Sequence, residues 1–98
     1  MLPDALQTLA KCRERIDQID RRLVELLNER TSVAEEIGRA KRGADLPIYE
    51  PKRESEVFNN ITSHNRGPLT EDGLKRIFER IIDEMRQIQR TRMETGAK

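Results

Sequence analysis

The stretch from residue 4 to residue 42 most constrains the fold, because a helical pattern runs through it without a break. It contains no proline, and its first glycine is Gly38. Apolar residues recur every seven positions in two series that lie three positions apart, which is the a/d pattern of a helix packed along one seam. The two series are Leu9, Ile16, Leu23 and Ile37, and Cys12, Ile19, Leu26, Val33 and Ala40. The pattern predicts one helix over residues 4–42.

A helix of that length is about 55 to 60 Å long. A compact domain of this size has a radius of gyration of only about 13 Å. We therefore expect the helix to project from the rest of the chain and its apolar seam to pack against a partner.

The remaining residues predict two further helices. Pro51 suits the first position of a helix over residues 50–64. Thr70 is a good cap for a helix over residues 70–92, in which apolar residues recur at spacings of three and four. No segment shows the alternation of a strand, so the predicted fold class is all-α, with three helices.

The sequence also predicts where the first and third helices end. Gly43 is expected to take the left-handed conformation that closes the first helix. Residues 93–98 lack an apolar pattern and are expected to be disordered. With 98 residues, the chain is expected to form a single domain, residues 1–98.

The amino-acid composition argues against several classes of function. The chain is 35% hydrophobic, with only three aromatic residues, so a lone chain would have a thin core and oligomerisation is expected. Its 19 basic and 18 acidic residues show no basic excess, which argues against a nucleic-acid partner. The single Cys12 fits a reducing, cytoplasmic setting. No signal peptide is evident, and no apolar stretch is long enough for a membrane helix.

Three cations interrupt or border the apolar seam of the first helix. Arg30 takes a position of the first series, and Arg13 and Lys41 each follow a position of the second. A cation buried without a partner is costly, so each one implies an anion. Carboxylates from elsewhere in the fold could supply it, but three cations on one helix favour an anionic ligand.

Polar residues on the other two helices complete a candidate pocket. Glu50, Arg53 and Glu54 open the second helix, and Gln89 falls beside the apolar stripe of the third. Taken alone, Gln89 is better explained as a satisfied interfacial amide, and ordinary surface ion pairing could explain the group on the second helix. Met85 is more easily explained as core than as a ligand contact. The set lacks a plausible nucleophile and a metal cluster, so it would act by holding a polyanion in a reactive shape and stabilising developing charge.

The order and spacing of these residues resemble the all-helical chorismate mutases, the AroQ class, from about Leu6 to Gln89. The matching positions are Arg13, Ile16, Ile19, Asp20, Leu26, Leu27, Arg30, Ile37, Gly38, Ala40, Lys41, Pro47, Tyr49, Glu50, Arg53, Glu54, Ile77, Phe78, Ile81, Ile82, Met85 and Gln89. The resemblance implies an intertwined homodimer of three-helix subunits. It also implies the Claisen rearrangement of chorismate to prephenate, on the route to phenylalanine and tyrosine, without a cofactor or a metal.

The resemblance also implies residue roles. Arg30 and the partner subunit's Arg13 would hold the two carboxylates of chorismate. Lys41 and Gln89 would be the catalytic pair at the ether oxygen, where negative charge develops. The substrate hydroxyl would bind Glu54 and the backbone around Glu50, which replaces an aspartate of other members. Two further positions belong to the implied site, Arg53 through its charge and Met85 in place of a small hydroxylic residue of some relatives.

A weaker resemblance concerns the partner. Residues 49–54 and the following Asn59, Asn60, Ile61, Gly67 and Pro68 look closer to the branch that is fused to, or works beside, DAHP synthase. Such a synthase is therefore a possible partner. The alternatives are an isochorismate-pyruvate lyase of the same fold and a non-catalytic regulatory or scaffolding module.

Overall fold

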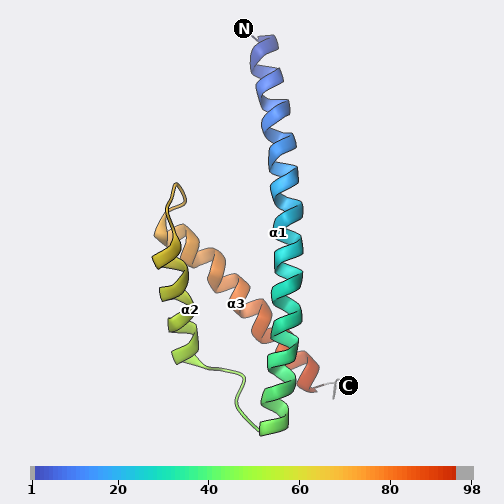
Figure 1. Ribbon diagram of the computed structural model, residues 1–98, viewed down its shortest axis with the longest axis vertical. Helices are drawn as coiled ribbons and strands as arrows, with labels where there is room; N and C mark the ends of the chain where they lie inside the picture. The colour runs from blue at the N-terminus through green and yellow to red at the C-terminus, as the bar shows by residue number, and fades with distance from the viewer. Residues whose placement is uncertain (1, 95–98) are drawn as a thin grey trace. The chain divides into compact units, whose positions relative to one another are not determined.

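The computed structural model describes the backbone of residues 2–94 and the side chains of residues 4–91. Three helices follow one another, α1 (Leu2–Ala44), α2 (Pro51–His64) and α3 (Glu71–Glu94) (Figure 1). No strand occurs in the described backbone. The prediction of an all-α chain with three helices is confirmed. Of the tail expected to be disordered, residues 93 and 94 are helical, and residues 95–98 lie outside the described part.

Two compact units make up the chain, Met1–Ser32 and Val33–Lys98. The first is the N-terminal part of α1 alone. The second holds the last turns of α1 together with α2 and α3, so every contact between helices described below lies within it. Each unit is described by itself.

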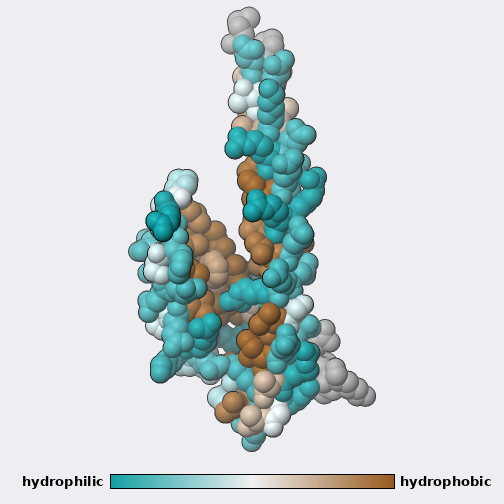
Figure 2. Space-filling view, in the orientation of Figure 1, coloured by the Kyte–Doolittle hydropathy of each residue, from teal (hydrophilic) through white to brown (hydrophobic). Residues whose placement is uncertain are grey.

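The first unit exposes the predicted apolar seam. Within it, Leu9, Ile16 and Leu23 are each about half exposed, and Cys12 is exposed as well. Brown apolar side chains follow this part of α1 in Figure 2. An isolated helix with such a stripe gains nothing from its apolar residues until another surface covers them.

The first helix ends differently from the expectation. Gly43 lies inside α1, and Asp45 takes the left-handed conformation instead, with φ of 57°. Aspartate tolerates this region better than most residues because its short side chain bonds locally. The Leu46 backbone N–H donates to the Lys41 carbonyl at 2.8 Å, which closes the helix. The turn sends the chain back past Lys41.

Helices α2 and α3 pack side by side (Figure 1). Pro51 occupies the first turn of α2, as predicted. The turn between the helices is held by Asn65, whose side chain donates to the Leu69 carbonyl and accepts from the Gly67 N–H. The Thr70 hydroxyl accepts from the Gly73 N–H at 3.0 Å, so Thr70 caps α3 as predicted.

The core of the second unit is small. Its buried apolar side chains among the described residues are Ala34, Ile82 and Met85. At Gly38, an added Cβ would lie 3.4 Å from the Cα of Gln89, so the backbones of α1 and α3 approach closely there. Ala34 and Gly38 lie one turn apart on α1, and their small size permits this approach. The crossing brings Lys41, one turn further along α1, next to α3.

Candidate active site

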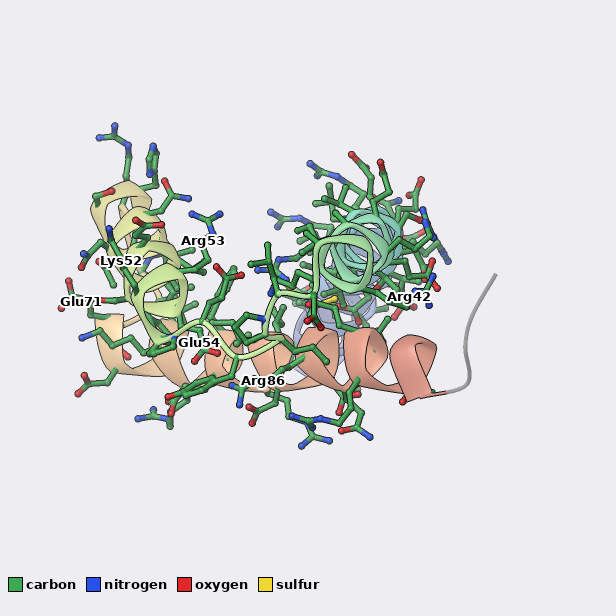
Figure 3. The ribbon with its side chains drawn as sticks, turned by 90° about the horizontal axis from the view of Figure 1, so that it is seen from below. Arg42, Lys52, Arg53, Glu54, Glu71 and Arg86 are labelled. Carbon is green, nitrogen blue, oxygen red and sulfur yellow. The ribbon has the colours of Figure 1, made fainter. Side chains whose placement is uncertain are left out.

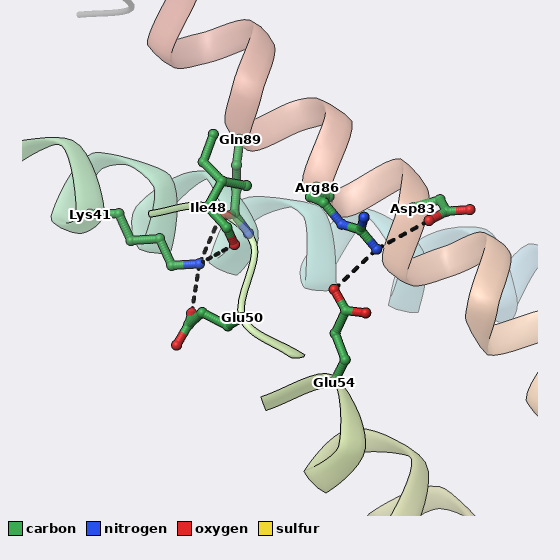
Figure 4. A network of polar contacts seen from close by, with 7 residues as sticks. All are labelled: Lys41, Ile48, Glu50, Glu54, Asp83, Arg86 and Gln89. Atoms are coloured by element: carbon green, nitrogen blue, oxygen red, sulfur yellow. Dashed lines mark hydrogen bonds and ion pairs between the residues drawn. The ribbon is translucent and has the colours of Figure 1, made fainter. Parts of the chain in front are cut away.

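Lys41 is the centre of a polar cluster beside this crossing. Its side chain is buried, and its ammonium has three acceptors (Figure 4). The Nζ atom lies 2.7 Å from Oε1 of Glu50 and donates to the Ile48 carbonyl at 2.9 Å and to Oε1 of Gln89 at 3.3 Å. An ammonium has three protons, so these contacts use its full donor capacity.

The acceptors of Lys41 come from two different parts of the chain. Ile48 and Glu50 belong to the segment that returns from α1, and Gln89 belongs to α3. Burial of an ammonium is favourable only when partners replace its lost hydration. The three acceptors meet that need and fix the position of the cation. The family resemblance groups Lys41, Glu50 and Gln89 in one site, and in the structure Glu50 and Gln89 both contact Lys41.

The oxygen and the NH₂ group of the Gln89 amide have different surroundings. Its carbonyl oxygen faces the Lys41 ammonium, which orients the amide because the NH₂ end would be repelled there. The described residues offer no hydrogen-bond partner to the NH₂ group. Only 9% of the residue is exposed. The cluster therefore contains a neutral donor, held by a buried cation and available for an acceptor.

A second ion pair joins α2 to α3. Nη2 of Arg86 lies 3.0 Å from Oε2 of Glu54 and 3.3 Å from Oδ1 of Asp83 (Figure 4). The Arg86 guanidinium also lies over the ring of Tyr49, 5.2 Å from its centroid. The Nε atom of Arg86 is buried without an acceptor among the described residues.

Sequence reasoning identified Glu54 and missed Arg86. The signal was present, because Arg86 directly follows Met85 and borders the apolar stripe of α3. Arg13 and Lys41 are predicted site residues because they border the α1 seam in the same way. The same test applied to α3 would have found Arg86.

The other predicted residues lie apart from this cluster or are not placed against it. Arg53 is 64% exposed and pairs with Glu56, on the side of α2 farther from α3 (Figure 3). Met85 is buried one turn before Gln89. Arg13 is exposed and Arg30 half-buried in the first unit. Their roles stay predictions.

Two further features are absent from the described part of the chain. No group of three or more histidine, cysteine, aspartate or glutamate residues could hold a metal ion there. None of the described helices has a stretch apolar and long enough to cross a bilayer.

The Lys41 cluster and the Arg86–Glu54 pair together offer two positive charges, a neutral amide donor and carboxylate acceptors. Lys41 and Gln89 together suit an oxygen that gains negative charge, since an ammonium and an amide both stabilise it without a proton transfer. The Glu50 and Glu54 carboxylates suit a hydroxyl donor. Such an arrangement is suited to binding and polarising a polar ligand.

Comparisons with known proteins agree with this chemistry. A family model described as chorismate mutase type II matches residues 12–90. The chain is 38% identical over 81 residues to a bifunctional chorismate mutase/prephenate dehydratase of Aquifex aeolicus, covering 79% of this chain and 22% of that protein. It is 27% identical over 90 residues to a chorismate mutase of Methanocaldococcus jannaschii, covering 91% of each. Thus it spans only a small part of the bifunctional relative and nearly all of the other.

A solved structure has the same fold. The structure of chorismate mutase (form II) from Thermus thermophilus superposes with a TM-score of 0.82 at 30% identity. The match covers 84% of this chain and 93% of that one. Sequence and fold lead to one conclusion, that the chain belongs to the type II chorismate mutase family.

Proposed function

We propose that the chain catalyses the rearrangement of chorismate to prephenate. The observation that carries the proposal is the buried contact between Lys41 and Gln89, with Glu50 on the same ammonium. In this reaction the ether C–O bond breaks while a C–C bond forms within one molecule, and negative charge develops on the ether oxygen. Lys41 and Gln89 supply the two donors that this oxygen needs.

Substrate binding requires an exchange at Lys41, because all three protons of its ammonium are already used. The bond to Oε1 of Gln89 is the longest of the three, at 3.3 Å, and the weakest by geometry. The ether oxygen would take over this proton, while the Gln89 NH₂ group donates to the same oxygen. Glu50 and the Ile48 carbonyl would keep the ammonium in place.

The remaining contacts follow the family resemblance. Arg30 and the partner subunit's Arg13 would hold the two carboxylates of chorismate in the folded conformation that rearrangement requires. Glu54 would accept a hydrogen bond from the substrate hydroxyl. Arg53 would add to the positive field of the site, and Met85 would line it. No cofactor takes part in this scheme.

The proposal includes a homodimer built on a very long first helix. The exposed seam of residues 9–27 supports it, because a contiguous apolar stripe of this kind usually marks an interaction surface. A second copy of α1 presents the same seven-residue repeat and would bury it. The lone Cys12 supports a cytoplasmic setting.

The DAHP synthase partner remains a proposal that rests on the resemblance of residues 49–54. The bifunctional relatives instead combine chorismate mutase with prephenate dehydratase. Co-elution of the purified chain with the host's DAHP synthase tests the association. Separate elution at micromolar concentrations would count against it.

The experiment follows the loss of chorismate absorbance with the purified chain, Arg30→Ala and Gln89→Ala. We expect conversion to prephenate, reduced by about 100-fold or more in each variant while both keep their helical circular dichroism. Salicylate formed from isochorismate would identify the lyase instead. Equal rates in all three proteins would refute the proposed site.

If the wild-type chain folds but converts chorismate only slowly, DAHP synthase is added to the assay. A large rise in rate would identify a mutase that depends on its partner. A folded chain without turnover in both conditions would favour the non-catalytic module.

A further inference from the structure

Arg86 differs from an ordinary surface arginine in what it contacts. It pairs with Glu54 across two helices, at 3.0 Å, and both side chains are about three-quarters buried, with 27% and 25% exposed. Arg80, six residues earlier on α3, pairs with Glu84 of its own helix and is 77% exposed. Exposed pairs within one helix contribute little, whereas a partly buried pair fixes geometry.

The two oxygens of the Glu54 carboxylate have different surroundings. Its Oε2 atom is taken by Arg86, and no described residue donates a hydrogen bond to Oε1. Arg86 precedes Gln89 by three residues, so both side chains leave the same side of α3. Figure 4 shows Glu54 and the Lys41 cluster together on that side. Arg86 thus holds one oxygen of the carboxylate, and the other oxygen has no donor among the described residues.

Arg86 itself is held on several sides. Asp83 binds the same Nη2 atom, and the Tyr49 ring lies against the guanidinium. The buried Nε atom finds no acceptor among the described residues. A lysine or an apolar residue would avoid that unpaired donor, but neither would offer a planar group that meets Glu54, Asp83 and Tyr49 together.

We propose that Arg86 is a positioning residue for the reaction, which holds Glu54 so that its Oε1 accepts the hydroxyl of chorismate. The proposal rests on the proposed function. Arg86 acts only through Glu54 and touches no reacting atom. Its loss lets the carboxylate turn away, and a misplacement of about 1 Å can lower a rate by about 100-fold.

A double-mutant cycle tests this role. The variants are Arg86→Met, Glu54→Ala and the double variant, with Arg80→Met as the matched control on the same helix. Because Arg86 acts through Glu54, we expect Arg86→Met to lower kcat/KM by about 10- to 100-fold. In the Glu54→Ala background, the same change should have an effect of less than about twofold. Arg80→Met should stay within about twofold of wild type.

A merely structural role predicts a different result. Loss of packing or folding would lower activity by the same factor in both backgrounds, so the two losses would multiply. That outcome, or Arg86→Met with wild-type kinetics, overturns the proposal. Should Arg86→Met fail to fold, Arg86→Lys replaces it in the cycle, with the same two expectations.

The wild-type assay separates this inference from the proposed function. A folded wild-type chain without turnover, alone or with DAHP synthase, overturns the proposed function and this inference with it. Wild-type turnover combined with multiplied losses in the cycle overturns the role of Arg86 alone.

Discussion

At the scale of single residues, the chemistry of the site depends on which groups stay neutral. Lys41 supplies a positive charge, and Gln89 supplies a donor that is neutral at every pH. A second cation at position 89 would be repelled by Lys41, and a carboxylate would lose the donor. In the structure the amide accepts from the ammonium through its oxygen, and its NH₂ end is left to donate to the substrate.

Replacing Gln89 with glutamate should make activity depend on pH. Only the protonated carboxyl can donate to the ether oxygen, so we expect kcat/KM of Gln89→Glu to rise as the pH falls from 8 to about 5. The ionised form should be slower than wild type by about 100- to 1,000-fold, the loss typical of one oxyanion donor. The measurement is kcat/KM across this pH range for wild type, Gln89→Glu and Gln89→Leu.

Gln89→Leu is the control for that experiment. It has no proton to gain, so its activity should be low throughout and should not recover in acid. A flat profile for Gln89→Glu, or equal profiles for both variants, would contradict the role assigned to the amide.

At the scale of helices, the site exists because α1 and α3 approach at Gly38. The close distance between Gly38 and Gln89 leaves room for a methyl group at most. Side chains that branch at Cβ would push α3 away and displace Gln89 from Lys41. The same contact thus sets the helix packing and the position of the Gln89 amide.

Substitutions at Gly38 and Gly43, the two glycines within α1, should separate the effect of helix packing on stability and activity from the effect of helix propensity. We expect Gly38→Val to destabilise the protein by about 1 to 3 kcal/mol and to reduce kcat/KM, because its methyl groups overlap Gln89. The matched change Gly43→Ala meets nothing within 4 Å and should stabilise by about 0.5 to 1 kcal/mol without affecting activity. Urea unfolding and the chorismate assay measure both effects. Full activity in folded Gly38→Val would show that the crossing does not position Gln89.

Helical periodicity made the three helices predictable from the sequence, since apolar stripes are repeated many times along each. The residues at which the helices end were harder to predict. The first helix passes Gly43 and turns at Asp45, because backbone bonds and the returning segment, rather than propensity, decide where it stops. The contact of Lys41 with Glu50 and Gln89 agreed with the family pattern. Arg86 could be singled out from its place beside the apolar stripe of α3, but its pairing with Glu54 could not, because pairings between helices leave no periodic trace in one sequence.

At the scale of the whole molecule, the chain has more apolar surface than it can cover alone. Its described buried core consists of few side chains, while the seam of the first unit stays exposed. A second copy would cover that seam and would bring a second set of cations. Arg13 would then complete the site of the other subunit instead of its own.

Mixing two inactive variants tests whether Arg13 acts across subunits. Arg13→Ala and Lys41→Ala should each be nearly inactive as homodimers. When they are refolded together in equal amounts, half of the dimers combine both chains, and one of the two sites in such a dimer has an intact Lys41 and an intact Arg13 from its partner. We expect the mixture to recover about a quarter of wild-type activity per chain.

The activity recovered by the mixture depends on which subunit's site each Arg13 enters, and not on the stability of the variants. If Arg13 served its own subunit, every site in the mixed dimers would lack either Arg13 or Lys41, and no activity would return. Refolding each variant alone is the control, and sedimentation of the mixture verifies that dimers have formed. A monomeric wild-type chain that turns over chorismate would refute the shared site directly, since a site that needs the partner's Arg13 gains activity only as chains associate.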